Sequence, residues 1–200
     1  YSDHAQPPAY AGYTIFVAEV ASTCNEVILF QHMIRQAETR EEKESLIFQL
    51  LDRFRSVMFR QTMFAEFELE MGKMSENGET LTADALCKKY YELNKLYFGP
   101  DMVSDEEIAL EWSRIPHFFY NYYVFQYATG FSAAVAIANR ILEKGAPAVA
   151  DYKRFLSSGS STDPISLLKI AGVDMSSPEP INEALKLFGS LIDELDALLK

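Results

Sequence analysis

The chain has 200 residues, 48% of them hydrophobic, and its formal net charge is −11 at pH 7. This length is enough for a hydrophobic core that needs no disulfide or metal to hold it together. Nucleic acids and anionic membranes attract clustered lysine and arginine, so the acidic balance excludes both as the main partner.

Cysteine usage and the start of the chain bear on the compartment. Cys24 and Cys87 are the only cysteines and have no CxxC spacing, which favours two reduced thiols in a cytosolic protein. No apolar stretch reaches the roughly 18 residues that a membrane span requires. The first eight residues, YSDHAQPP, have neither the basic start nor the apolar centre of a signal peptide. We therefore expect a cytoplasmic protein.

Helical periodicity runs through the chain, and neither an alternating strand pattern nor an internal repeat is present. After an irregular segment over 1–13, the pattern predicts helices over about 14–37 and 40–71, with a break from Gly72 to Gly78. Further helices are predicted over about 82–98, 104–112, 116–144, 148–156, 164–171 and 180–200. The capping sequence Ser104-Asp-Glu-Glu and the first-turn proline Pro116 mark two of these starts. We predict an all-α fold in which residues 1–200 form a single helical region.

The stretch FVAEVASTCNE, residues 16–26, places two carboxylates on one side of the first long helix. Glu19 and Glu26 are seven residues apart, which is close to two helical turns. In one interpretation they form a solvated stripe while Val20 and Cys24 face the core. In the other, the bulky residues before Glu19 bury this turn, and the carboxylates then need a hydrogen-bond, ion-pair or metal partner. Spacing alone leaves both interpretations open.

Aromatic and histidine side chains gather in RIPHFFYNYYVFQY, residues 114–127. On the predicted helix His117, Tyr120 and Tyr127 lie near one stripe, and Tyr122 lies on a different face from Tyr123. An aromatic core helix whose hydroxyls bond to backbone groups is one interpretation. Histidine and tyrosine can also donate hydrogen bonds to a developing oxyanion, which is the catalytic alternative.

Three stretches of the chain resemble oligoendopeptidase F, a zinc metallopeptidase family of the thimet oligopeptidase superfamily. The first, YTIFVAEVASTCNE, is similar to the helix that supplies the third zinc ligand in that family. The second, IPHFFYNYYVFQYATG, is similar to the helix that carries the substrate-side histidine and tyrosines. The third is the tail, where FLSSGSS, PISLLK, AGVDM and SPEP resemble the family's C-terminal end. The resemblance covers nearly the whole chain in order.

The resemblance implies a role for individual residues. Glu19 matches the third zinc ligand, and Glu26 would hold a zinc-ligand histidine in place. His117 and Tyr122 match positions that bind the scissile carbonyl and stabilise the tetrahedral intermediate, with Tyr120 and Tyr127 as further candidates. The parent would be a zinc-dependent endopeptidase with a zincin-like catalytic domain that hydrolyses short peptides by attack of zinc-activated water.

The chain departs from the family at one decisive motif. HExxH, which supplies two histidine ligands and the general base, is missing from all 200 residues. We therefore expect the C-terminal part of a longer peptidase, whose N-terminal part is its necessary partner, and we expect the fragment alone to be inactive and free of zinc. The alternative is a non-catalytic helical binding or scaffold protein derived from the same fold.

Overall fold

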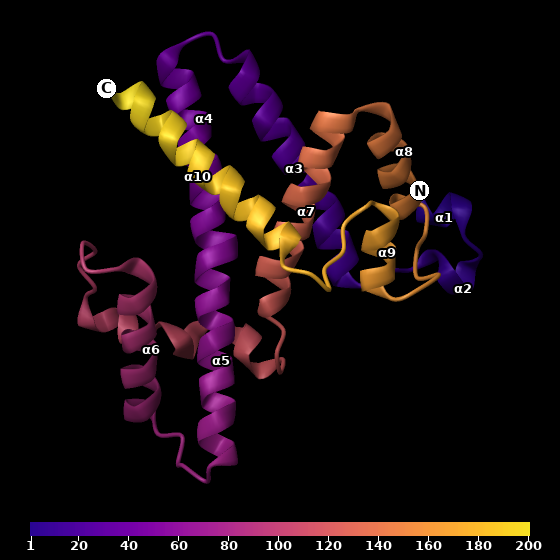
Figure 1. Cartoon of the computed structure of the whole chain (residues 1–200). Coiled ribbons are helices and arrows are strands. Elements are labelled where there is room, and N and C mark those ends of the chain that lie inside the picture. Colours follow the sequence, from indigo (N-terminus) through magenta and orange to yellow (C-terminus); the bar gives the residue numbers. More distant parts are fainter. The chain divides into compact units, whose positions relative to one another are not determined.

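The computed structural model describes all residues, 1–200, and contains helices and connecting turns but no strand (Figure 1). The predicted all-α class is therefore confirmed. The residues form two compact units: unit 1 consists of Tyr1–Arg55 with Thr129–Lys200, and unit 2 is Ser56–Ala128. That both belong to one helical region of a catalytic domain stays a prediction.

The helices have the following bounds. The first half of the chain contains α1 (Ser2–Ala5), α2 (Pro8–Ala11), α3 (Ile15–Gln36), α4 (Arg40–Arg53), the π-helical turn η1 (Phe54–Phe59), α5 (Arg60–Glu76) and α6 (Ala83–Phe98). The second half contains two 3₁₀ segments, η2 (Glu106–Arg114) and η3 (Pro116–Phe119), followed by α7 (Phe125–Lys144), α8 (Ala146–Leu156), α9 (Pro164–Ile170) and α10 (Glu179–Leu199).

Three predicted helix starts are confirmed by side-chain caps. Thr39 accepts a hydrogen bond from the backbone N–H of Glu42, and Thr82 accepts one from Ala85. The carboxylate of Asp163 accepts the backbone N–H of Ser166 at 3.0 Å. Each cap satisfies one of the N–H groups that a helix leaves unpaired in its first turn.

Several predicted boundaries are wrong for identifiable reasons. The segment 1–13 holds two single-turn helices, and α5 continues through Gly72 to Glu76. Ser104 caps no helix, because its hydroxyl donates to the Oδ1 of Asn94 at 3.0 Å. The segment that follows it is 3₁₀ in geometry and starts at Glu106.

Helix α7 forms the centre of unit 1, where every residue from Gly130 to Ala138 is buried. A Cβ at Gly130 would lie 3.5 Å from the ring of Phe16, so α3 passes close to α7 at this point. The buried Phe54 ring meets the edge of Phe131 at a centroid distance of 4.8 Å and that of Phe188 at 5.3 Å. Helix α10 packs across α4 in the same unit (Figure 1).

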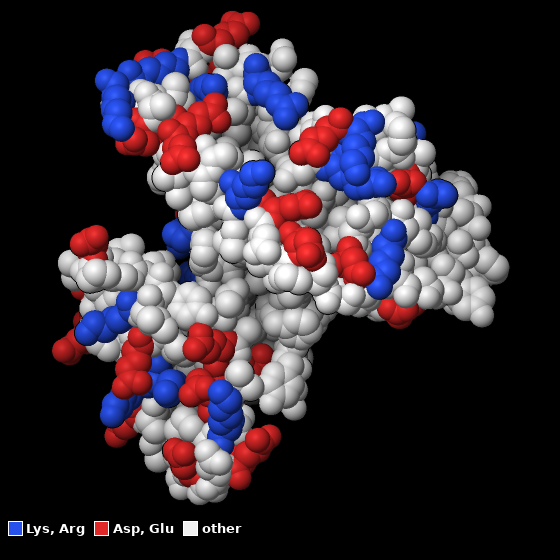
Figure 2. Space-filling view, viewed as in Figure 1, with Lys and Arg blue, Asp and Glu red and all other residues white.

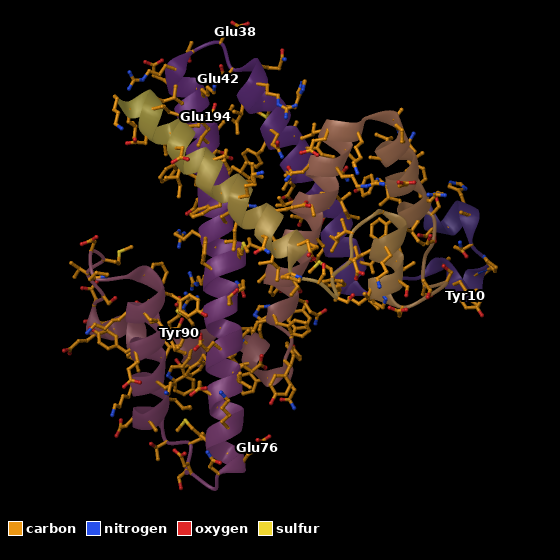
Figure 3. The ribbon with its side chains drawn as sticks, viewed as in Figure 1. Tyr10, Glu38, Glu42, Glu76, Tyr90 and Glu194 are labelled. Carbon is orange, nitrogen blue, oxygen red and sulfur yellow. The ribbon has the colours of Figure 1, made fainter.

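Unit 2 has an aromatic core between α5 and α6. Tyr90 points from α6 toward α5 (Figure 3), where its ring meets the edge of Phe67 at 5.2 Å. The Tyr90 hydroxyl donates to Glu111 on η2 at 2.6 Å, and Glu111 also forms ion pairs with Arg60 and Arg114. The hydroxyl is therefore satisfied where the ring is buried, as buried tyrosines require.

Acidic and basic side chains are interspersed on the visible face of the molecule, and no extended basic patch stands out there (Figure 2). None of the helices combines the length and apolarity that crossing a membrane requires.

Candidate functional site

Helix α3 carries Glu19 on its exposed side. Val20 and Cys24 are fully buried, while Glu19 and Ser22 are exposed. Of the two interpretations of this stretch, the solvated stripe is the one found in this structure. The bulky residues before Glu19 bury its turn only on the core side, since Val17 is buried whereas Ile15 is 52% exposed.

Glu26 lies two turns further along the exposed side of α3. Its carboxylate forms an ion pair with Arg53 at the end of α4. Both side chains are more than 40% exposed, so the pair contributes little to stability. The pairing nonetheless shows that the Glu26 carboxylate faces another helix and can hold a cationic or hydrogen-bond-donating group.

The residues of this chain do not complete a zinc site. No group of three or more His, Cys, Asp or Glu side chains lies close enough together to hold a metal ion. A protein zinc site uses at least three such ligands, and Glu19 would supply one. Its exposed carboxylate forms no hydrogen bond or ion pair, so it is open to a ligand from outside this chain.

The long helix predicted from Pro116 is wrong. Residues 116–119 form a single 3₁₀ turn, residues 120–124 are irregular, and α7 begins at Phe125. The interruption lies at Tyr122, the one non-glycine residue with a positive φ, at 55°. The predicted stripe of His117, Tyr120 and Tyr127 therefore does not exist as a helical face.

The irregular backbone nevertheless brings His117 and Tyr127 together in unit 2. The Tyr127 hydroxyl lies 3.2 Å from the Nε2 of His117. The ring of Tyr123 stacks on the His117 ring at a centroid distance of 5.7 Å. His117, Tyr123 and Tyr127 thus form a compact cluster, in which Tyr123 is a member that sequence reasoning did not assign.

Tyr120 and Tyr122 lie beside this cluster with their side chains largely in solvent. Tyr120 is 63% exposed and its ring meets the edge of Tyr123 at 6.3 Å. Tyr122 is 52% exposed and is the immediate neighbour of Tyr123 in the chain. Unit 2 therefore presents a histidine and several phenolic hydroxyls, each able to donate a hydrogen bond to a carbonyl oxygen.

Two residues of α5 that sequence reasoning missed hold Tyr122. The Glu68 carboxylate accepts the backbone N–H of Tyr122 at 2.6 Å. A Cβ at Gly72 would lie 3.0 Å from the Tyr122 hydroxyl oxygen. A signal for Glu68 was present, because Phe64, Phe67 and Met71 place it within an apolar helical face.

Comparison with known proteins identifies the class to which this fold and these residues belong. The sequence profile of peptidase family M3 matches residues 1–187. The chain belongs to peptidase family M3.

The relatives identify the branch of the family more closely. The chain is 53% identical over 199 residues to oligopeptidase PepF of Bacillus subtilis, covering 100% of this chain and 30% of that protein. It is 42% identical over 195 residues to the chromosomal oligoendopeptidase F of Lactococcus lactis, covering 98% of this chain and 32% of the relative. The chain thus spans about a third of the length of these relatives.

Solved structures agree with this assignment. The crystal structure of oligoendopeptidase-F from Enterococcus faecium matches with a TM-score of 0.88 and 44% identity, over 94% of this chain and 36% of that one. The structure of a putative peptidase from Chlamydophila abortus matches with a TM-score of 0.91 and 40% identity, over 98% of this chain and 33% of that one. The resemblance to oligoendopeptidase F is therefore confirmed.

Proposed function

We propose that the chain forms the C-terminal part of a zinc-dependent oligoendopeptidase that hydrolyses short peptides. The observation that carries this proposal is the 53% identity to oligopeptidase PepF, which extends over the whole of this chain. The other two thirds of such a protein would supply the HExxH helix with two histidine ligands and the general base.

Glu19 is the zinc ligand that this chain contributes. The exposed Glu19 carboxylate has no intramolecular partner, so no ion pair has to break when it binds a metal. Glu26 would exchange its exposed contact with Arg53 for the ring N–H of a zinc-ligand histidine, which orients that ring. When bound, zinc supplies an activated water and polarises the scissile carbonyl.

His117 and Tyr122 form the substrate side of the site, with Tyr120 and Tyr127 as additional donors. The hydrogen bond between Tyr127 and His117 limits the orientations of the imidazole ring. A preoriented donor costs no reorganisation when negative charge develops on a carbonyl oxygen, which is why such donors favour the transition state over the substrate. The Tyr122 side chain is half exposed, so a peptide can reach it from the solvent side.

The compartment and partners follow from the same assignment. Peptide substrates and the remaining part of the polypeptide are the partners we propose, in the cytoplasm. The isolated chain has one zinc ligand and no HExxH, so we propose that it neither holds zinc nor cleaves peptides on its own.

The decisive experiment expresses the protein that carries this chain in its complete reading frame. We expect one zinc ion per protein by elemental analysis, and hydrolysis of a quenched fluorescent peptide that a chelator abolishes. Glu19→Ala should lose the zinc, whereas Glu41→Ala, at an exposed position of α4, should retain it. Full zinc occupancy in Glu19→Ala contradicts the ligand assignment.

The substrate side is tested by kinetics in the same protein. His117→Ala and Tyr122→Phe should each lower kcat by about 10²–10³-fold if each side chain donates to the oxyanion. Unchanged kcat in both variants would show that His117 and Tyr122 have a purely structural role. A protein that binds no zinc and cleaves no peptide supports the non-catalytic scaffold instead.

A further inference from the structure

The backbone of Tyr122 has a conformation that an aromatic residue avoids. Its φ of 55° lies in the left-handed region, where a Cβ crowds the following carbonyl oxygen and destabilises the backbone. The residue here is neither glycine, which has no Cβ to crowd the carbonyl, nor asparagine, whose short polar side chain offsets the crowding by local hydrogen bonds. Something in the surrounding structure must therefore stabilise the turn.

Glu68 stabilises the turn at Tyr122, although burying its own carboxyl is unfavourable. Its side chain is buried at 7% exposure, and the backbone N–H of Tyr122 is its hydrogen-bond partner at 2.6 Å. No cation pairs with it, and burial raises the pKa of this carboxyl while the bond from Tyr122 opposes that rise. A buried carboxyl without a counter-ion is unfavourable for folding, so stability alone does not explain glutamate at this position.

Gly72 is the second unfavourable choice on the same side of α5. It lies one turn after Glu68, within a helix that continues to Glu76, where glycine is less favourable than alanine. A Cβ here would lie 3.0 Å from the Tyr122 hydroxyl oxygen, closer than carbon and oxygen normally approach. Glycine therefore leaves the space that this hydroxyl occupies.

Three locally unfavourable choices thus converge on one half-exposed tyrosine. Such conflicts between local preference and the native structure concentrate at functional sites. Resting on the proposed function, we infer that Glu68 and Gly72 are positioning residues: Glu68 holds the Tyr122 backbone, Gly72 seats the Tyr122 hydroxyl, and together they aim this donor at the peptide substrate.

The same turn also orients the histidine cluster. Tyr123 follows Tyr122 directly and stacks on His117, with an angle of 26° between the rings. A change in the backbone at Tyr122 redirects the chain at Tyr123 and so alters the contact on which the imidazole rests. Release of the Glu68 bond therefore disturbs both substrate-side groups at once.

The first test uses the complete peptidase and a double-mutant cycle. Glu68→Ala should lower kcat by about 10–100-fold, since misplacing a reacting group by about 1 Å has effects of that order. In a Tyr122→Phe background the same change should have a clearly smaller effect, limited to the disturbance of His117 through Tyr123, because the hydroxyl that Glu68 helps to position is already absent. Glu68→Gln keeps an oxygen that can accept the Tyr122 N–H and should restore most of kcat.

The matched control is Glu76→Ala, an exposed glutamate on the same helix, which should leave kcat unchanged. An equal loss from Glu68→Ala with and without the Tyr122 hydroxyl overturns the inference. The Tyr122→Phe single variant tests the proposed function by itself, so failure of that function is recognised separately.

Gly72→Ala separates positioning from stability. Alanine should displace the Tyr122 hydroxyl and lower kcat, yet strengthen α5. Thermal unfolding of the complete peptidase should show an unchanged or higher midpoint for this variant. Unchanged kcat in this variant contradicts the role of Gly72.

A readout independent of activity addresses the backbone contact. Hydrogen exchange at the Tyr122 amide should be faster in Glu68→Ala than in the wild type and in Glu76→Ala. Equal exchange rates in all three proteins would show that Glu68 does not hold the turn, whatever the kinetics.

Discussion

The hydroxyl of Tyr152 on α8 donates a hydrogen bond to the backbone carbonyl of Ala21 on α3 at 2.9 Å, next to the buried thiol of Cys24. Ala21 and Cys24 are the second and fifth residues after Glu19. Helix α8 is therefore bound to the part of α3 that presents the proposed zinc ligand.

Tyr152→Phe tests this connection. The phenylalanine ring fills the same space but leaves the Ala21 carbonyl without one of its donors, although Asn25 also donates to it. We expect the free energy of unfolding to fall by about 1 kcal/mol, the usual net value of one such bond. Urea unfolding followed by circular dichroism measures it, and Tyr10→Phe, at a 52% exposed side chain, is the control. Equal values for the two variants would contradict this account.

The two cysteines should differ in reactivity. Burial raises the pKa of the Cys24 thiol from an ordinary 9.0 to about 12, and a hydrogen bond with Tyr152 opposes that rise only in part. The thiolate is the reactive form, so iodoacetamide at about pH 8 should modify the native protein at the half-buried Cys87 and spare Cys24. Mass spectrometry locates the label, and both residues should react in urea. Rapid labelling of Cys24 in the native protein would contradict the prediction that its thiol is buried and protonated.

The same shift predicts a loss of stability at alkaline pH. The unfolded chain releases the Cys24 proton above about pH 9, whereas the folded chain retains it up to about pH 12. Stability linked to this group is complete below about pH 9 and falls as the pH rises through that interval. Cys24→Ala removes the titrating group, so its unfolding midpoint should depend less on pH over the same range.

Asp174 predicts the opposite dependence in acid. The hydroxyl and the backbone N–H of Ser176, with help from Lys169, lower its pKa from 3.8 to about 2. The contribution of this carboxylate is complete above about pH 4 and disappears as the pH falls toward 2. Asp174→Asn should lower the thermal midpoint at neutral pH, and its difference from the wild type should shrink on acidification. Asp193→Asn, at an exposed position of α10, should show no such convergence.

Phe54 should be among the most sensitive core positions of unit 1. Its side chain is fully buried between the rings of Phe131 and Phe188. Phe54→Ala should reduce the free energy of unfolding by about 3–5 kcal/mol, because it removes transfer energy and leaves a cavity. Phe48→Ala, at a 64% exposed side chain, should change it by less than about 0.5 kcal/mol in urea unfolding. Similar losses in both would contradict the packing described for Phe54.

Sequence reasoning found those elements whose signals are local. Helices α3, α6 and α10 follow from apolar periodicity, and the start of α9 follows from the Asp163 cap. The path after Pro116 was missed because its determinant is remote: the backbone at Tyr122 is set by Glu68, 54 residues earlier. Gly72 was read as a break because glycine weakens a helix, whereas the tertiary fit to Tyr122 gives it a place inside one.

Among the candidate site residues, too, local sequence patterns could not predict what tertiary contacts decide. The outward direction of Glu19 was one of two interpretations, and its spacing from the buried valines could not choose between them. The contact between His117 and Tyr127 depends on the irregular turn, so helical spacing predicted their proximity for a wrong geometric reason.

The division of the chain into units has a consequence for synthesis. Unit 2, Ser56–Ala128, is continuous in sequence, whereas unit 1 joins Tyr1–Arg55 to Thr129–Lys200. During translation unit 2 is synthesised as one continuous segment, whereas the apolar faces of α3 and α4 stay exposed until α7 and α10 have also been synthesised. Closing unit 1 therefore depends on contacts of long sequence separation, which form slowly and leave apolar surface exposed in the meantime. Any chaperone dependence of this part of the protein should accordingly originate in α3 and α4.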